Sequence, residues 1–215
     1  MKSFLNTIRC DEKPISVSRQ VVDTFAIILL GIALGTFSKF IDNTAVNELP
    51  FIFGYLDIGN FLGRFAIWVL IAICISIYSN SSIRAAINVF VFFVGMITSY
   101  YLYSKFVAGF FPRSYAMIWY GFTAISPLLA FICWYAKGKS KLSFAISSMI
   151  IAVLFNMTFF YSMTYFGMRS ILELIAFICG LVALKRNTIK NTIIMTAIGV
   201  ILAFILNLLV PFHLG

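Results

Sequence analysis

The stretch GMRSILELIAFICG, residues 167–180, carries an arginine and a glutamate at the start of an apolar run. Arg169 and Glu173 are four residues apart, so on a helix they would lie one turn apart on the same face. Such a pair fits two roles: an ion pair that anchors a helix end, or part of a polar site that binds a solute. The arginine precedes the glutamate, which is the less favourable order for the helix dipole, so the order argues against a capping role.

Further residues could join this pair in a binding site. Lys39 and Arg64 are expected at the ends of other helices on the same side, and residues 100–120 are rich in aromatic side chains. The loop at residues 41–60 is long, acidic and aromatic, which is typical of a binding loop or lid. The ligand-binding residues that we predict are Arg64, Tyr101, Trp119, Arg169 and Glu173.

The sequence carries no recognisable catalytic motif. H-E-x-x-H, G-x-S-x-G and P-loop patterns are absent, and each would mark a particular reaction. His213 is the single histidine, so a metal centre that relies on several imidazoles is not expected. The cysteines form no C-x-x-C pair, which argues against a zinc or redox motif. We therefore expect a non-enzymatic protein with no cofactor and no bound metal.

The composition indicates what must position these side chains. Of 215 residues, 62% are hydrophobic and 11% are charged, with a mean hydropathy of +1.02. Soluble domains carry about 25% charged residues, whereas a transmembrane helix needs roughly 20 apolar residues in a row. The chain is therefore expected to lie in a lipid bilayer. The net charge of +9 is then explained by basic cytoplasmic loops, and no nucleic-acid partner is expected.

The predicted fold is all-α, a polytopic bundle of seven transmembrane spans. The spans are 21–40, 61–79, 83–104, 115–136, 142–165, 169–184 and 191–210. With a cytoplasmic N-terminus and an external C-terminus, eleven of the 16 basic residues lie inside, as the positive-inside rule requires. The run 169–184 is short, and without it six spans remain and the charge bias disappears. Residues 1–20 are predicted to be a cytoplasmic polar tail, and residues 21–215 a single transmembrane domain.

Two features inside the spans could contact other helices. Gly31 and Gly35 are four apart in the first span, a spacing that lets another helix approach closely. That helix could belong to this chain or to a partner protein. Asn156 lies near the middle of the fifth span, where an amide is expected to form a hydrogen bond between helices.

Three stretches carry a resemblance to a known family: GTFSKFID (35–42), IYSNSSIRAAINVFVFFVGMITSYYLYS (77–104) and ISPLLAFICWYAKGKSKL (125–142). They resemble a family of uncharacterised small membrane proteins from Gram-positive bacteria, which implies the bacterial inner (cell) membrane and no particular chemistry. The layout is also similar to the substrate-binding subunits of energy-coupling-factor transporters. That likeness rests on small residues in the first helix and a long first outer loop, and the seven expected spans depart from that family's six.

Two functions remain open on these grounds. The first is a protein that binds or transports a small solute through an outward-facing pocket built from the five residues named above. The second is a non-catalytic scaffold subunit that docks a membrane protein partner through the Gly31 and Gly35 face.

Overall fold

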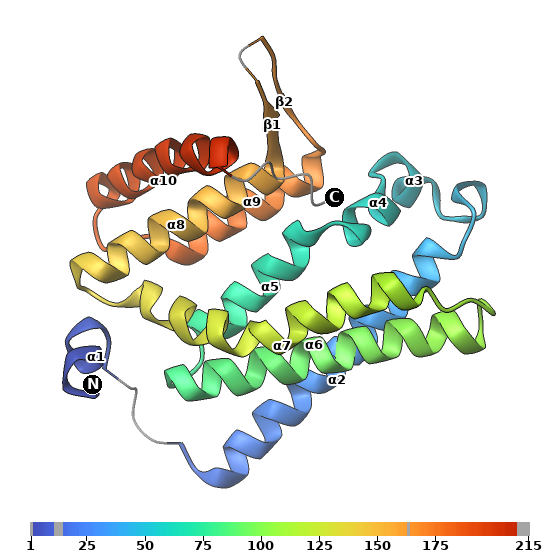
Figure 1. Cartoon of the computed structure of the whole chain (residues 1–215), viewed down its shortest axis with the longest axis horizontal. Helices are drawn as coiled ribbons and strands as arrows, with labels where there is room; N and C mark the ends of the chain where they lie inside the picture. Colours follow the sequence, from blue (N-terminus) through green and yellow to red (C-terminus); the bar gives the residue numbers. More distant parts are fainter. Residues whose placement is uncertain (1, 11–14, 163, 210–215) are drawn as a thin grey trace.

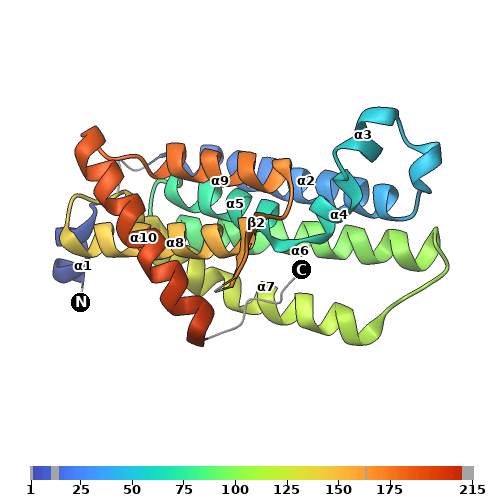
Figure 2. The ribbon, with the colours of Figure 1, turned by 90° about the horizontal axis from the view of Figure 1, so that it is seen from above.

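The computed structural model describes residues 2–10, 15–162 and 164–209 and confirms the all-α class (Figure 1). His213 lies outside the described residues. The main helices are α2 (Val17–Asp42), α5 (Phe65–Ile77), α6 (Ser82–Phe106), α7 (Arg113–Trp134), α8 (Lys141–Thr158), α9 (Ile171–Leu184) and α10 (Ile189–Leu209). They form a layered bundle in which α2 packs on α6, α6 on α7, and α8 on α10. Seen from above, α10 crosses α8 at a steep angle (Figure 2).

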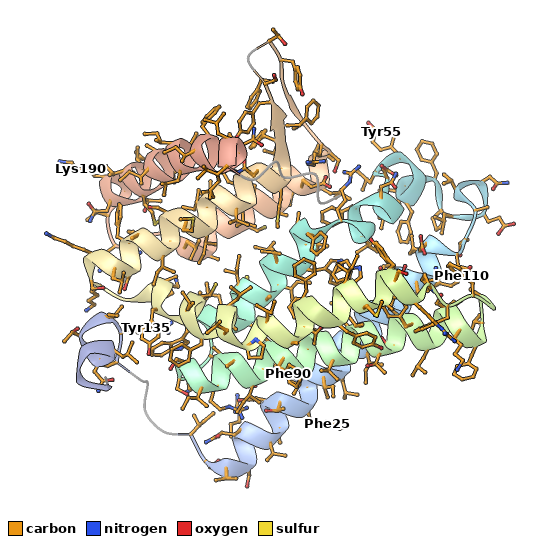
Figure 3. The ribbon with its side chains drawn as sticks, in the orientation of Figure 1. Phe25, Tyr55, Phe90, Phe110, Tyr135 and Lys190 are labelled. Carbon is orange, nitrogen blue, oxygen red and sulfur yellow. The ribbon has the colours of Figure 1, made fainter. Side chains whose placement is uncertain are left out.

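Five of these helices are long and apolar enough to cross a membrane, namely α2, α6, α7 with the turn that follows it, α8 and α10. The other two, α5 and α9, are equally apolar but have 13 and 14 residues. Large apolar side chains on the bundle's outside are exposed, as Phe25 and Phe90 illustrate at 62% and 40% (Figure 3). An apolar surface of this extent suits hydrocarbon rather than water.

The predicted fifth span, 142–165, ends earlier than expected. Helix α8 stops at Thr158, and the chain continues as a short antiparallel hairpin of β1 (Phe159–Tyr161) and β2 (Phe166–Met168). Aromatic residues favour strands because they pack well across a hairpin. Here the ring of Phe159 stacks on that of Phe166 with centroids 5.3 Å apart. The first strand occupies residues that apolarity alone assigned to a helix, whereas the second lies between two predicted spans.

The stretch 41–60 is a folded segment rather than an open loop. It contains η1 (Val46–Glu48) and α3 (Phe51–Tyr55), and then turns at Asp57 into α4 (Ile58–Gly63). Asp57 has a φ of 53°, a left-handed conformation that aspartate tolerates better than most residues. The turn directs α4 toward the start of α5.

Residues 1–20, the predicted polar tail, contain helix α1 (Lys2–Ile8) and the first turn of α2. Ile8 is buried, and the Arg9 guanidinium donates to the carbonyl oxygens of Ile77 at 3.0 Å and Trp134 at 2.7 Å. Arg9 also lies over the Trp134 ring, 4.2 Å from its centroid. The start of the chain is thereby held against the ends of α5 and α7.

A second arginine joins the loops at this end. The Arg186 guanidinium donates to the carbonyl oxygens of Gly138 and Ser143 at 2.7 and 2.8 Å, and to the Ser147 hydroxyl at 2.8 Å. Burial lowers the pKa of Arg186. Arg9, Lys185 and Arg186 also lie near Lys137 at the end of η2 (Tyr135–Lys137). Positive charge is therefore concentrated at this end of the bundle.

Candidate functional site

Glu173 forms a buried ion pair, and its partner is Arg64. Arg64 Nη1 lies 2.7 Å from Glu173 Oε1. The Glu173 side chain is 0% exposed and that of Arg64 is 25% exposed. Arg64 occupies the extended position between α4 and α5, with φ −95° and ψ 164°, and Glu173 lies in the first turn of α9. The pair therefore joins two helix starts that are 109 residues apart in the chain.

Ser170 completes the surroundings of the carboxylate. Its side chain caps α9 by accepting a hydrogen bond from the Leu172 N–H at 3.2 Å, and its hydroxyl donates to Glu173 Oε2. Ser170 and Glu173 are three apart and sit at the positions of a capping box. The side chain that caps α9 is thus that of Ser170, and Glu173 accepts the hydrogen bond of its hydroxyl. The S-x-x-E spacing was the signal in the sequence that could have revealed it.

Arg169 does not take the place that helical spacing predicted for it. Helix α9 begins at Ile171, so Arg169 precedes the helix and the four-residue rule does not apply to it. Its backbone N–H donates to the Thr158 carbonyl at 2.9 Å, as part of the connection from β2. Arg64, rather than Arg169, carries the positive charge beside Glu173. Because both Glu173 oxygens are engaged and the side chain is covered, this pair acts as a structural connection between α5 and α9.

Lys39 also lies apart from the Arg64–Glu173 pair. Its ammonium forms an ion pair with Asp42 Oδ2 and lies 5.3 Å from the centroid of the Tyr100 ring. The Tyr100 hydroxyl donates to the same carboxylate oxygen at 3.1 Å. These three residues connect the end of α2 to α6.

The two aromatic residues of the predicted pocket lie in two different cavities. Trp119 stacks on Phe65, with ring centroids 4.5 Å apart and planes 14° apart, and lines a cavity between α5, α6, α7 and α8. Tyr101 lines a separate pocket between α6 and α7. The residues that were predicted to line one pocket therefore lie in different places. Glu173 and Arg64 form a buried ion pair, Trp119 lines an apolar cavity and Tyr101 lines a second pocket.

The apolar cavity has a volume of about 520 Å³, which is large enough for a small organic ligand. Its walls are almost entirely aliphatic and aromatic, and three hydroxyl side chains also line it. Each hydroxyl donates to a carbonyl of its own helix: Ser76 to Ala72 at 2.8 Å, Thr123 to Trp119 at 2.9 Å and Ser126 to Thr123 at 2.9 Å. The cavity consequently offers a ligand few free hydrogen-bond donors.

Gly31 and Gly35 lie against α6 of the same chain. A Cβ atom at Gly31 would be 2.3 Å from the Phe92 carbonyl oxygen, and one at Gly35 would be 2.1 Å from that of Met96. On α6, a Cβ atom added at Gly95 would be 2.8 Å from the Ile28 carbonyl oxygen of α2. The two helices approach closely through these glycines. A partner protein that docked on this face would have to displace α6.

Asn156 forms the expected bond between helices. Its amide donates to the Ala203 carbonyl of α10 at 3.0 Å, and its oxygen accepts from the Tyr161 hydroxyl at 2.6 Å. These bonds connect α8 to α10 and to the hairpin. Within the described part of the chain, Asn156 thus holds neighbouring elements together through hydrogen bonds.

Over the residues that the structure describes, the fold and these sites define an all-α protein with five helices that could cross a membrane and with the two cavities described above between its helices. Among the described residues, no three His, Cys, Asp or Glu side chains come together as they would around a metal ion. No family model, curated protein or solved structure matches the chain. The likenesses noted in the sequence therefore stay predictions.

Proposed function

We propose that this protein binds a lipophilic solute, of the size of part of a lipid chain, in the cavity between α5, α6, α7 and α8. The observation that carries the proposal is the cavity's lining, in which every hydroxyl is already bonded to its own helix. A polar solute that entered would lose its hydrogen bonds to water and gain few in return. An apolar solute would lose nothing of this kind.

The way into the cavity supports the same class of solute. Several lining residues are also exposed on the outside of the bundle: Leu129 at 54%, Ile132 at 45% and Met149 at 43%. They belong to α7 and α8, so the cavity opens sideways between these helices. In a membrane this opening faces hydrocarbon, where lipid chains are abundant. The sequence predicted a small solute of unspecified class, and the position of this opening favours a solute that enters from the bilayer. Any transport would then begin in the hydrocarbon of the membrane.

Tryptophan fluorescence tests the proposal, because Trp68 lines the cavity although it is only 3% exposed. Trp134 is buried in a different cluster and serves as the internal reference. In bilayers of phosphatidylcholine with brominated acyl chains, we expect Trp119→Phe, which retains Trp68 and Trp134, to be strongly quenched. The variant that also carries Trp68→Phe should show little quenching, because bromine quenches only indole rings that it contacts.

Equal quenching in these two variants would contradict the proposal. Filling the cavity provides the matched control. Val153→Phe adds volume to the α8 wall of the cavity, and we expect it to protect Trp68 while Trp134 emission is unchanged. If Trp68 were quenched as strongly in Val153→Phe as in its parent, lipid would be reaching it by a route other than the cavity.

We further propose that α5 and α9 also cross, which makes seven spans in a cell membrane with the N-terminus inside. Three observations support this: successive main helices run in alternating directions (Figure 1), both short helices are apolar, and this arrangement keeps eleven of the 16 basic residues on one side. A helix of 13 residues is about 20 Å long, so α5 would need α4 or a thinner bilayer to complete its crossing.

Cysteine labelling in intact cells tests the orientation. In a cysteine-free background, Lys139→Cys and Asn187→Cys should resist a membrane-impermeant maleimide, because both exposed positions would face the cytoplasm. Asn47→Cys, exposed at the opposite end, should react. External labelling of Asn187→Cys together with protection of Lys139→Cys would indicate that α9 does not cross.

A further inference from the structure

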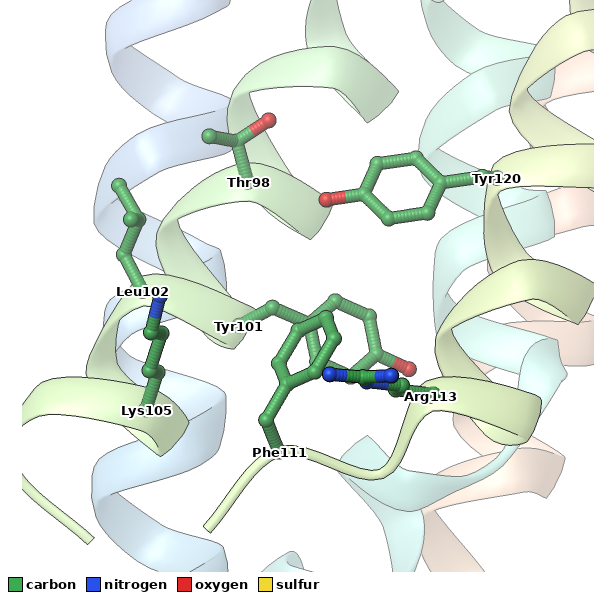
Figure 4. A pocket seen from close by; sticks show the side chains of 7 residues that line it. All are labelled: Thr98, Tyr101, Leu102, Lys105, Phe111, Arg113 and Tyr120. Atoms are coloured by element: carbon green, nitrogen blue, oxygen red, sulfur yellow. The ribbon is translucent and has the colours of Figure 1, made fainter. Parts of the chain in front are cut away.

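The second pocket lies at one end of the bundle, between the last turns of α6 and the first turns of α7. It has a volume of about 490 Å³. Its lining residues are Thr98, Tyr101, Leu102, Lys105, Phe111, Arg113 and Tyr120 (Figure 4). Lys105 extends from α6 and Arg113 from the start of α7, so the two cations approach from opposite walls (Figure 4).

The charge of the pocket is unbalanced. Lys105 and Arg113 are both cationic, and no acidic side chain belongs to the lining. Within the described part of the chain, neither cation forms a hydrogen bond or an ion pair with a carboxylate, although Lys105 lies 5.3 Å from the centroid of the Phe106 ring. A hollow lined by two cations and no anion attracts a negatively charged group.

Tyr101 supplies an independent indication. The residue is 4% exposed, and its hydroxyl is the buried side-chain polar atom without a hydrogen-bond partner among the described residues. Its ring is held by Phe111 and Tyr120, with centroids 5.7 and 6.1 Å away. Buried hydroxyls are nearly always paired. An unpaired one in the wall of a cationic pocket is a donor positioned for an acceptor oxygen.

The start of α7 adds further donors. Pro112 at its N-cap provides no side-chain hydrogen bond, so the first N–H groups of this 22-residue helix are not capped by a side chain. Those N–H groups and the helix dipole favour an anion near Arg113. The arginine fork also matches two oxygens of one phosphate group.

From these observations we propose that the pocket of Tyr101, Lys105 and Arg113 binds a phosphate group. The two cations balance its charge, and the Tyr101 hydroxyl donates to one of its oxygens. Leu102 and Phe111 also line this pocket and are exposed at 50% and 40%, so an acyl chain could lie beside the phosphate. This leaves two sources for the phosphate: the headgroup of an anionic lipid, or a soluble phosphate. This proposal does not depend on the binding of a lipophilic solute in the cavity between α5, α6, α7 and α8. Either of the two proposals could fail while the other holds.

The test measures thermal unfolding of the purified protein in a neutral detergent. The probes are inorganic phosphate and phosphatidylglycerol, with sodium chloride of equal ionic strength and phosphatidylcholine as references. A rise in the midpoint with inorganic phosphate assigns a soluble source, and a rise with phosphatidylglycerol alone assigns a lipid headgroup. No rise with either probe beyond its reference would overturn the proposal.

Variants locate the effect. Lys105→Gln with Arg113→Gln should weaken the apparent affinity for the active probe by tenfold or more, since two charge-assisted contacts are lost. Lys139→Gln with Lys185→Gln removes two exposed lysines from the other end of the molecule and should leave the affinity unchanged. Equal weakening in both double variants would show that only general charge attraction is measured, and would overturn the assignment to this pocket.

Tyr101→Phe separates binding from folding. Without the probe, this variant should be at least as stable as the parent, because the hydroxyl that it removes has no partner. With the probe, its apparent affinity should fall by about threefold to tenfold, the equivalent of one hydrogen bond. A Tyr101→Phe protein that binds the probe as tightly as the parent would remove Tyr101 from the site.

Discussion

Arg64→Met is expected to lower the free energy of unfolding by about 3–5 kcal/mol, the usual effect of removing one partner from a buried ion pair. The reason is the asymmetry of the pair, in which Glu173 is completely covered and Arg64 is the partially exposed member. Without the guanidinium, the Glu173 carboxylate would keep, among its partners in the described part of the chain, the hydrogen bond from Ser170. The connection between the starts of α5 and α9 would be lost with it.

A double variant distinguishes this explanation from a simple loss of packing. Arg64→Met combined with Glu173→Gln removes the unpaired charge and keeps a polar group next to Ser170, so more than half of the lost stability should return. Arg19→Met is the matched control, because Arg19 pairs with Asp23 in an exposed i,i+4 arrangement and should change stability by about 0.5 kcal/mol or less. Denaturation with dodecyl sulfate, followed by circular dichroism, provides the measurement. A double variant no more stable than Arg64→Met alone would contradict the role assigned to the carboxylate.

Gly35→Ala is expected to destabilise the protein by about 1–3 kcal/mol or more, through overpacking. The new methyl group would lie 2.1 Å from the Met96 carbonyl oxygen and 2.4 Å from the Ser99 hydroxyl. A backbone oxygen on a packed helix cannot move aside as a flexible side chain can. Helices α2 and α6 would therefore have to separate along their contact.

Gly121→Ala is the control for this substitution. Gly121 lies inside α7 with nothing within 4 Å of an added Cβ, so alanine should stabilise the helix by up to about 1 kcal/mol. The two variants carry the same chemical change, and their effects should have opposite signs when unfolding is followed as above. Equal effects at the two positions would contradict the close contact between α2 and α6.

The helices could largely be predicted from the sequence because long apolar runs have few alternatives in a membrane. The predicted runs 21–40 and 83–104 correspond to α2 and α6, with ends a few residues further out. The hairpin at 159–168 was missed because its residues are as apolar as those of a helix. What distinguishes it is the pairing of strands and rings, such as Phe159 on Phe166, which depends on contacts that periodicity does not contain.

The candidate site was harder to predict, for a physical reason. The identity of an ion-pair partner depends on where a helix begins, and a shift of two residues moved Arg169 off the face of Glu173. Arg64 was included among the predicted residues, yet its pairing spans 109 positions of the chain. Tyr101 lies on α6 and Trp119 on the neighbouring helix α7, but the two residues line different cavities. Which way a side chain points around a helix follows from packing against several neighbours at once.

The contact between Arg9 and the Trp134 carbonyl also determines the order in which the chain can assemble during synthesis. Its two residues are separated by 125 positions, and a chain made from the N-terminus presents Arg9 long before its acceptor exists. Arg9 therefore cannot make this contact until α7 has been made. Closing so large a loop is a late event in folding, so Arg9 is among the last residues to reach its final place although it is made long before Trp134.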